Sequence, residues 1–173
     1  MVVVLIGYMG SGKSAVGKEL ARTLGIPFTD LDEKIIEEVG MPIPQLFEEK
    51  GEIFFRKKEG AVLQQLLQQK ESAVLATGGG TPCYGNIMEI LQKSDNTITV
   101  YLRGGVGTLT QRLFRHRTNR PLIAHLNTPE LLEDFIRKHL FERSFYYNQA
   151  SIVVDIDTKP VPEIVQEIYA RLF

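Results

Sequence analysis

The sequence predicts an α/β protein: a five-stranded parallel sheet covered by helices on both faces, in three layers. Two observations predict it. Short apolar runs rich in β-branched residues recur along the chain, and segments with helical periodicity separate them. The length of 173 residues and the hydrophobic content of 43% fit one domain spanning residues 1–173. No repeat, low-complexity segment or linker divides the chain.

The expected strands share short length and apolar character; in order, they are Val2–Ile6, Ile26–Thr29, Ala73–Ala76, Thr97–Leu102 and Ile152–Asp155. The expected helices share apolar residues three and four positions apart; they are Ser14–Leu24, Leu31–Val39, Glu59–Gln69, Gly85–Gln92, Val106–Phe114, Pro129–Tyr146 and Pro162–Leu172. Strands that alternate with helices form parallel sheets through right-handed crossovers. Ligands bind at the carboxyl ends of such strands, so functional residues should follow them directly.

Composition narrows the possible partners. The net charge of −1 gives no global electrostatic reason to expect a nucleic acid or a membrane surface as partner. The single cysteine, Cys83, excludes an internal disulfide, and the three histidines lack a metal-binding spacing. No apolar run approaches the ~20 residues of a membrane span, and Met1 leads directly into the first strand without a signal segment. We therefore expect a cytoplasmic monomer.

A glycine-rich segment follows the first strand. Gly7-Tyr8-Met9-Gly10-Ser11-Gly12-Lys13-Ser14 matches GxxxxGK[ST], with a strand before it and a helical pattern after it. In such a loop, backbone N–H groups and a helix N-terminus point at a phosphate. Lys13 would reach the β- and γ-phosphates, and the Ser14 hydroxyl would ligate Mg²⁺. The segment predicts a nucleoside triphosphate site.

Two carboxylates follow the second strand. If Asp30-Leu31-Asp32 is extended, both carboxylates face one side, where one could hold a Mg²⁺-bound water and the other could accept a hydroxyl proton. The alternative is an N-cap with an acidic residue in the first helical turn. Proximity to a phosphate loop favours the functional interpretation.

Three glycines, Gly78, Gly79 and Gly80, follow the third strand. Three successive glycines cost backbone entropy, which favours a loop that a ligand approaches closely over a merely flexible connection.

Arginines supply the remaining candidates. Arg56, beside two phenylalanines, and Arg143, near the end of an expected helix, are either exposed charges or a pocket for a carboxylate. The segment from Arg112 to Ile123 carries four arginines and ends in Arg120-Pro121-Leu122-Ile123. It is either a solvated or nucleic-acid-binding face, or a lid over residues of about 112–125 that brings an arginine to a transferring phosphoryl group.

Taken in order, these motifs resemble the shikimate kinase family of P-loop kinases. Gly7–Ser14 is similar to its G-[FY]-M-G-[AS]-G-K-[ST], and Asp30-Leu31-Asp32 to its D-x-D element. Gly51-Glu52 through Phe55-Arg56 is similar to G-E-x-x-F-R, Gly78–Gly80 to the glycine triplet, and Arg120–Ile123 to the R-P-L-L of the lid. The family usually has Pro-Leu-Tyr after the arginine at Arg143, whereas this chain has Ser144-Phe145-Tyr146-Tyr147.

The resemblance implies a P-loop kinase fold with a mobile lid and ATP-dependent phosphorylation of the 3-hydroxyl of shikimate. It implies that Gly10, Ser11, Gly12, Lys13, Ser14 and Ala15 hold the ATP phosphates, with Ser14 on Mg²⁺ and Asp30 supporting the metal through water. It also implies Asp32 as base and hydroxyl ligand, Arg56 and Arg143 as a carboxylate clamp, and Gly78, Gly79 and Gly80 at the acceptor. Arg120 would reach the γ-phosphate and Arg112 the adenine, with Thr158-Lys159-Pro160 on the adenine side.

Three alternatives remain. A gluconate-kinase-like enzyme would share the phosphate loop and the lid, but the ordered D-x-D, F-R and triple-glycine elements speak against it. A GTPase-like regulator would need an N-K-x-D element, which the sequence lacks. A nucleic-acid-binding role would rest on the lid arginines alone and would require steeply salt-dependent binding.

Overall fold

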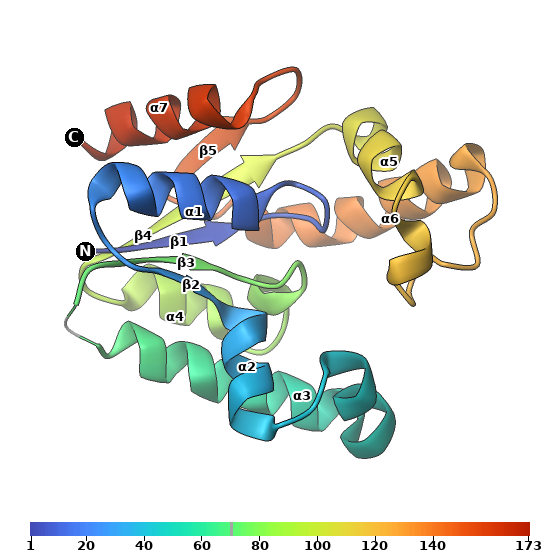
Figure 1. The fold of residues 1–173 in the computed structure, drawn as a ribbon, viewed down its shortest axis with the longest axis horizontal. Helices are drawn as coiled ribbons and strands as arrows, with labels where there is room; N and C mark the ends of the chain where they lie inside the picture. The colour runs from blue at the N-terminus through green and yellow to red at the C-terminus, as the bar shows by residue number, and fades with distance from the viewer. Residues whose placement is uncertain (70) are drawn as a thin grey trace.

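Five strands form one parallel sheet in the order β2-β3-β1-β4-β5 (Figure 1). The computed structural model describes residues 1–69 and 71–173. The strands are β1 (Val2–Ile6), β2 (Phe28–Asp30), β3 (Ala73–Ala76), β4 (Thr97–Arg103) and β5 (Ile152–Asp155). Val4 in the central strand pairs with Leu75 of β3 on one side and with Thr99 of β4 on the other. The predicted sheet is confirmed.

Helices cover both faces of this sheet. The helices are α1 (Lys13–Leu24), α2 (Leu31–Val39), α3 (Ile43–Leu67), α4 (Ile87–Lys93), α5 (Val106–Phe114), α6 (Pro129–Tyr147) and α7 (Val161–Leu172). Short 3₁₀ helices lie at Thr81–Cys83 and Arg117–Asn119. All five residues of β1 are buried, because alternate side chains pack into two apolar clusters on opposite faces.

Val3 and Leu5 pack with residues of α1 and α7. Val2, Val4 and Ile6 pack with residues of α3, α4 and α6. Figure 1 shows α1 and α7 on one side of the sheet and α3 and α4 on the other. The three predicted layers are therefore present.

Helix α3 differs from the prediction, which began a helix at Glu59. It starts at Ile43 and is interrupted at Gly51, whose backbone has φ 83° and ψ 170°. Before Glu59 the apolar residues do not form a single stripe: Ile53 and Phe54 adjoin the buried Phe55 but are themselves 76% and 43% exposed. Without that stripe, periodicity does not indicate a helix.

Within residues 1–69 and 71–173, no helix has both the length and the apolar character to span a bilayer.

Candidate active site

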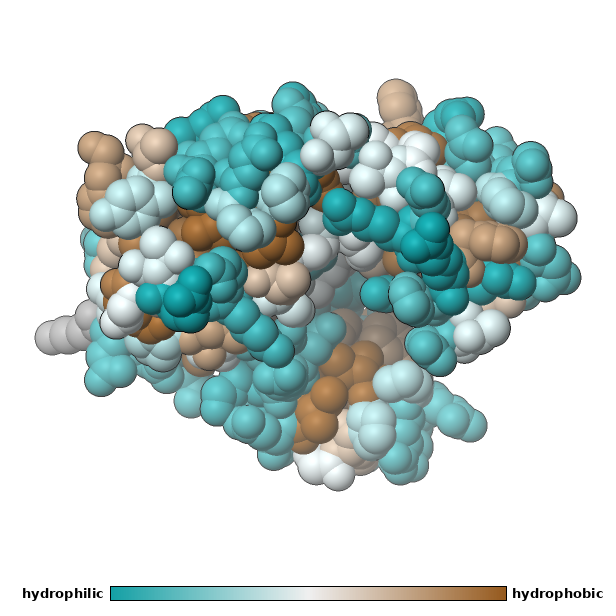
Figure 2. All heavy atoms as spheres, turned by 45° about the horizontal axis from the view of Figure 1, so that its top comes forward, coloured by the Kyte–Doolittle hydropathy of each residue, from teal (hydrophilic) through white to brown (hydrophobic). Residues whose placement is uncertain are grey.

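The carboxyl ends of β1, β2 and β3 open onto one cavity of about 670 Å³. Its walls come from the phosphate loop, the start of α2, the glycine triplet, α5 and the segment after α5. The lining residues are Met9, Gly10, Gly12, Lys13, Ser14, Ala15, Asp30, Asp32, Thr77, Gly78, Gly79, Arg112, Leu113, His116 and Arg120. Figure 2 shows the surface hollowed on one face of the molecule. Convergence of these segments at one sheet edge confirms the expectation from the alternating strands.

The phosphate loop curls around the side chain of its lysine. Gly10 and Gly12 have φ of 78° and 91°, a backbone conformation that residues other than glycine rarely adopt. The Lys13 ammonium donates hydrogen bonds to the carbonyl oxygens of Gly7 at 2.8 Å and Tyr8 at 3.0 Å. Burial lowers the pKa of Lys13 to about 8, against the opposing effect of the Asp32 carboxylate.

Ser11 is the one residue of the predicted phosphate-binding set that lies outside the cavity wall. Its side chain is 1% exposed, and its hydroxyl makes no hydrogen bond to the described part of the chain. A Cβ atom built on Gly7 would lie 2.9 Å from this hydroxyl oxygen, so Ser11 packs inside the loop. Its backbone N–H donates to the Tyr8 carbonyl oxygen at 3.1 Å, so it too is engaged within the loop.

Asp30 ends β2 and caps α2, and the extended interpretation of Asp30-Leu31-Asp32 is wrong. The Asp30 carboxylate accepts hydrogen bonds from the backbone N–H groups of Asp32 at 2.9 Å and Glu33 at 3.4 Å. Asp32 therefore lies in the first helical turn, because an N-cap aspartate starts the helix there. Both carboxylates nevertheless line the cavity.

The oxygen donors next to the phosphate loop fit Mg²⁺. The Ser14 hydroxyl donates a hydrogen bond to the second carboxylate oxygen of Asp30, at 3.0 Å. Mg²⁺ prefers one or two protein oxygens, with waters and phosphate oxygens completing its shell. A hydroxyl and a carboxylate at this spacing supply that small donor set.

Burial raises the pKa of Asp32 to about 6, reinforced by the Asp30 and Glu59 carboxylates and opposed by Lys13 and Arg56. A carboxyl group with such a pKa is a better proton acceptor than an exposed aspartate.

We expect Asp32→Asn to raise the thermal stability at pH 7. Between pH 3.8 and about 6 the folded chain holds a proton that the unfolded chain releases, so the free energy of unfolding falls as pH rises through that range. The neutral amide removes this penalty, worth about 1–2 kcal/mol after allowance for partial solvent exposure. Melting curves should show a gain of a few degrees at pH 7 that disappears near pH 4.

Glu33→Gln is the matched control for that measurement, since Glu33 lies in the same helical turn with an exposed side chain. It removes the same favourable interaction with the helix N-terminus but no buried charge. An Asp32→Asn variant that is no more stable than Glu33→Gln at pH 7 would contradict the electrostatic argument.

The glycine triplet provides space rather than unusual backbone angles, since none of its residues has positive φ. A Cβ atom on Gly79 would lie 3.1 Å from the Met9 backbone nitrogen. A Cβ atom on Gly80 would lie 2.8 Å from the Arg56 guanidinium and 3.1 Å from that of Arg143. The triplet therefore lets two guanidinium groups approach the backbone beside the cavity.

Arg56 and Arg143 converge on Gly80 from different helices, α3 and α6. Neither arginine lines the main cavity; Arg56 lines a neighbouring groove of about 640 Å³. Arg56 donates a hydrogen bond to the Glu59 carboxylate at 2.9 Å, and Glu59 is only 2% exposed. The structure thus brings the two predicted clamp arginines together, despite the unusual residues that follow Arg143.

Three supporting residues were missed by sequence reasoning. Glu59 holds Arg56, the ring of Tyr84 lies 3.9 Å from the Arg56 guanidinium carbon, and the Tyr147 hydroxyl donates to the Gly79 carbonyl oxygen. Glu59 had a signal, since it follows Arg56 by three positions, the spacing of a helical ion pair. For the two tyrosines the sequence offered none, because their contacts join distant segments.

The arginine-rich segment borders the cavity at its outer side. Arg112 of α5 donates to the Gly10 carbonyl oxygen at 3.3 Å, and Arg120 reaches the cavity from beyond the 3₁₀ helix. His116 also lines this wall. Thr158, Lys159 and Pro160 are absent from the cavity lining.

A phosphate loop facing a carboxylate with a raised pKa, with arginines on the outer wall, defines a P-loop phosphotransferase for small molecules. The family model described as shikimate kinase matches residues 9–173. The chain belongs to the shikimate kinase family, and it is a kinase.

Relatives agree along nearly the whole length. The shikimate kinase of Flavobacterium psychrophilum is 46% identical over 99% of this chain and 98% of its own length. The crystal structure of shikimate kinase from Bacteroides thetaiotaomicron superposes with a TM-score of 0.89 at 33% identity, covering 99% and 98% of the two chains. Shikimate kinase from Acinetobacter baumannii, solved in complex with shikimate, gives 0.83 at 33% identity, covering 99% and 92%.

A gluconokinase from Sinorhizobium meliloti shares the fold alone. It is 24% identical, with a TM-score of 0.58 over 99% of this chain and 92% of its own. The gluconate-kinase alternative is therefore not favoured.

Proposed function

We propose that this protein transfers the γ-phosphoryl group of ATP to the 3-hydroxyl of shikimate, producing shikimate 3-phosphate and ADP for aromatic amino-acid biosynthesis. The observation that carries the proposal is the meeting of Arg56 and Arg143 at Gly80, beside the cavity that holds Lys13 and Asp32. Two guanidinium groups suit a carboxylate, and a hydroxyl on the same molecule would then face Asp32.

Each group has a role that follows from its place. Backbone N–H groups of the loop residues that line the cavity, Gly10 and Gly12 to Ala15, bind phosphate oxygens, while Lys13 and Arg120 neutralise the charge that develops during transfer. Asp32 orients the acceptor hydroxyl and accepts its proton, as its raised pKa favours. Gly78, Gly79 and Gly80 would lie at the acceptor, and Gly80 leaves room for both guanidinium groups.

Nucleotide and metal take the remaining positions. Ser14 would hold Mg²⁺ directly and Asp30 through water; the ion supplies charge neutralisation to the phosphates when bound. Arg112 would lie against adenine, with Thr158-Lys159-Pro160 near the base. The segment of about 112–125 acts as a lid in this proposal. We further propose one domain over residues 1–173, working as a cytoplasmic monomer without nucleic-acid or membrane partners.

The test is ADP release by the purified protein with Mg·ATP, comparing shikimate, gluconate, AMP and no acceptor. Turnover that depends on shikimate alone is expected. Turnover with gluconate instead would contradict shikimate as the acceptor, turnover with AMP would contradict the carboxylate clamp, and nucleotide binding without turnover would favour a regulatory role.

A further inference from the structure

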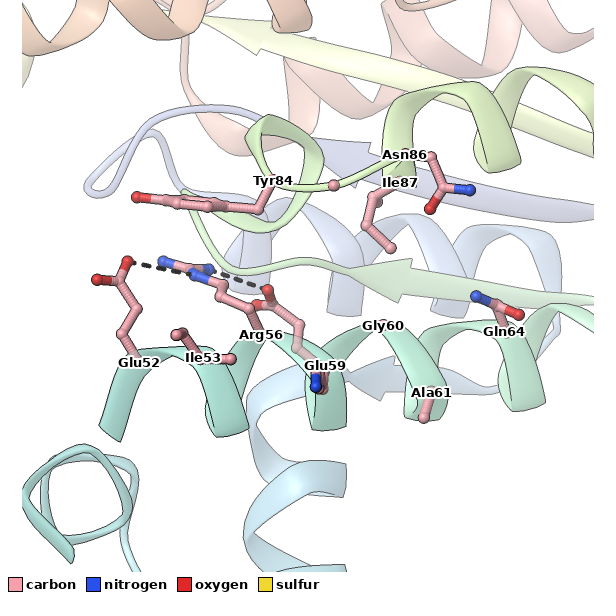
Figure 3. Close-up of a pocket in the computed structure, with 12 residues that line it drawn as sticks. Glu52, Ile53, Arg56, Glu59, Gly60, Ala61, Gln64, Tyr84, Asn86 and Ile87 are labelled. Atoms are coloured by element: carbon pink, nitrogen blue, oxygen red, sulfur yellow. Dashed lines mark hydrogen bonds and ion pairs between the residues drawn. The ribbon is translucent and has the colours of Figure 1, made fainter. Parts of the chain in front are cut away.

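The guanidinium group of Arg56 lies against the ring of Tyr84. Its central carbon is 3.9 Å from the ring centroid, well within the range of a cation–π contact. Figure 3 shows the ring lying across the guanidinium group, on the side away from α3. Tyr84 directly follows the 3₁₀ helix Thr81–Cys83, so a loop residue covers one face of a cation supplied by a helix.

The hydrogen-bond donors of Arg56 lie in the plane of the group, at its edges. One edge is occupied, because Nη1 donates to Glu59. Nε is buried and makes no hydrogen bond to the residues that the structure describes. The carboxylate oxygen of Glu52 is 3.9 Å from Nε, beyond hydrogen-bond range. Nη2 makes no hydrogen bond to the described residues and, unlike Nε, is not buried, so it is the donor available to an oxygen of a carboxylate.

Nη2 of Arg56 borders the proposed acceptor site. A Cβ atom on Gly80 would lie 2.8 Å from Nη2 of Arg56 and 3.1 Å from Nη2 of Arg143, so both groups border the same point. The segment after Gly80 fixes Arg56 in two ways. The Thr81 hydroxyl holds the Glu59 carboxylate at 2.9 Å, and Tyr84 covers the guanidinium face.

We infer that Tyr84 is a positioning residue for substrate recognition: its ring fixes the plane of the Arg56 guanidinium, so that Nη2 is presented to the carboxylate of the acceptor. Glu59 holds one edge of the group, and the Phe55 ring lies farther away, at 5.1 Å from the guanidinium carbon, so Tyr84 makes the closer ring contact. The inference rests on the proposed function. It assigns the effect to the ring, because the ring is the part of Tyr84 that lies against the guanidinium group.

The first experiment separates acceptor recognition from nucleotide use. Tyr84→Ala should raise KM for shikimate about tenfold, the scale of one cation–π contact, with KM for ATP unchanged. Tyr84→Phe keeps the ring and should remain within about twofold of the unaltered enzyme. Tyr169→Ala is the matched control: Tyr169 is 45% exposed against 38% for Tyr84, and lies on α7 across the sheet. It should change neither constant.

The second experiment asks whether the effect passes through Arg56. In an Arg56→Gln background, Tyr84→Ala should change kcat/KM for shikimate by less than about twofold, since the group it positions is gone. An undiminished effect in that background, or equal KM values in Tyr84→Ala and Tyr84→Phe, would overturn the inference. Both experiments require that the unaltered protein phosphorylates shikimate. If the proposed function is wrong, the unaltered protein will show no shikimate-dependent turnover, and this is seen before any variant is compared.

Discussion

Lys13→Ala is expected to lower kcat by about a thousandfold or more while the protein remains folded. The Lys13 ammonium lies in the cavity, with only the carbonyl oxygens of Gly7 and Tyr8 as hydrogen-bond partners among the described residues. Burial already disfavours its charge, as the lowered pKa indicates, so folding depends little on it. Its positive charge matters when the phosphoryl group moves, because it neutralises the negative charge that develops on the phosphate oxygens.

Lys18→Ala is the control for this experiment, since Lys18 is exposed on the same helix, α1. Single-turnover phosphorylation of shikimate measures the chemical step, and melting curves check the fold. Turnover within tenfold of the unaltered enzyme would remove Lys13 from the mechanism. A large fall in melting temperature would instead make Lys13 a structural residue.

Arg56→Ala is expected to lower kcat/KM for shikimate by about a hundredfold to a thousandfold, with little change in KM for ATP. The loss corresponds to a charge-assisted contact whose partner is left unpaired, about 3–4 kcal/mol. Steady-state kinetics with each substrate varied in turn provides the measurement. An unchanged kcat/KM would contradict the assignment of Arg56 to the carboxylate clamp.

The ion pair of Arg56 with Glu59 complicates that variant and also supplies its control. Without Arg56, the Glu59 carboxylate stays buried with only the Thr81 hydroxyl as partner, which should destabilise the protein. Adding Glu59→Gln removes the unpaired charge. The double variant should therefore regain stability but not kcat/KM, which separates recognition of the acceptor from loss of folded protein.

The sheet and the phosphate loop were predictable because their signals are local. The β-branched run Val2–Ile6 leads directly into the glycine-rich loop, and both appear where the sequence indicated. The first half of α3 was not predictable in this way. Its exposed Ile53 and Phe54 disrupt the apolar stripe, and Gly51 breaks the helix within it.

The residues of the candidate site likewise divide into those with a local sequence signal and those without one. Lys13, Asp32 and Gly79 follow strands directly, so the topology alone places them at one edge. The contact of Tyr84 with Arg56 joins two segments whose relative placement depends on packing of the whole chain. No periodicity or motif records such a contact. For Asp32, the sequence indicated the chemistry, but its backbone conformation depended on whether Asp30 capped a helix.

The hydrogen bond from Tyr147 to the Gly79 carbonyl oxygen gives α6 a second contact with the glycine triplet, beside that of Arg143. Positions 143 and 147 are one helical turn apart, so both point from α6 towards the glycine loop, whereas Phe145 between them is 70% exposed. The helix therefore constrains the spacing between Arg143 and Tyr147 rather than the residue type at position 145. Tyr146 packs against the core, so Phe145 is the exposed position of this turn, and a one-residue insertion there would rotate one anchor away by about 100°. Phe145 is accordingly a suitable place to attach a fluorescent label without disturbing the anchors on either side.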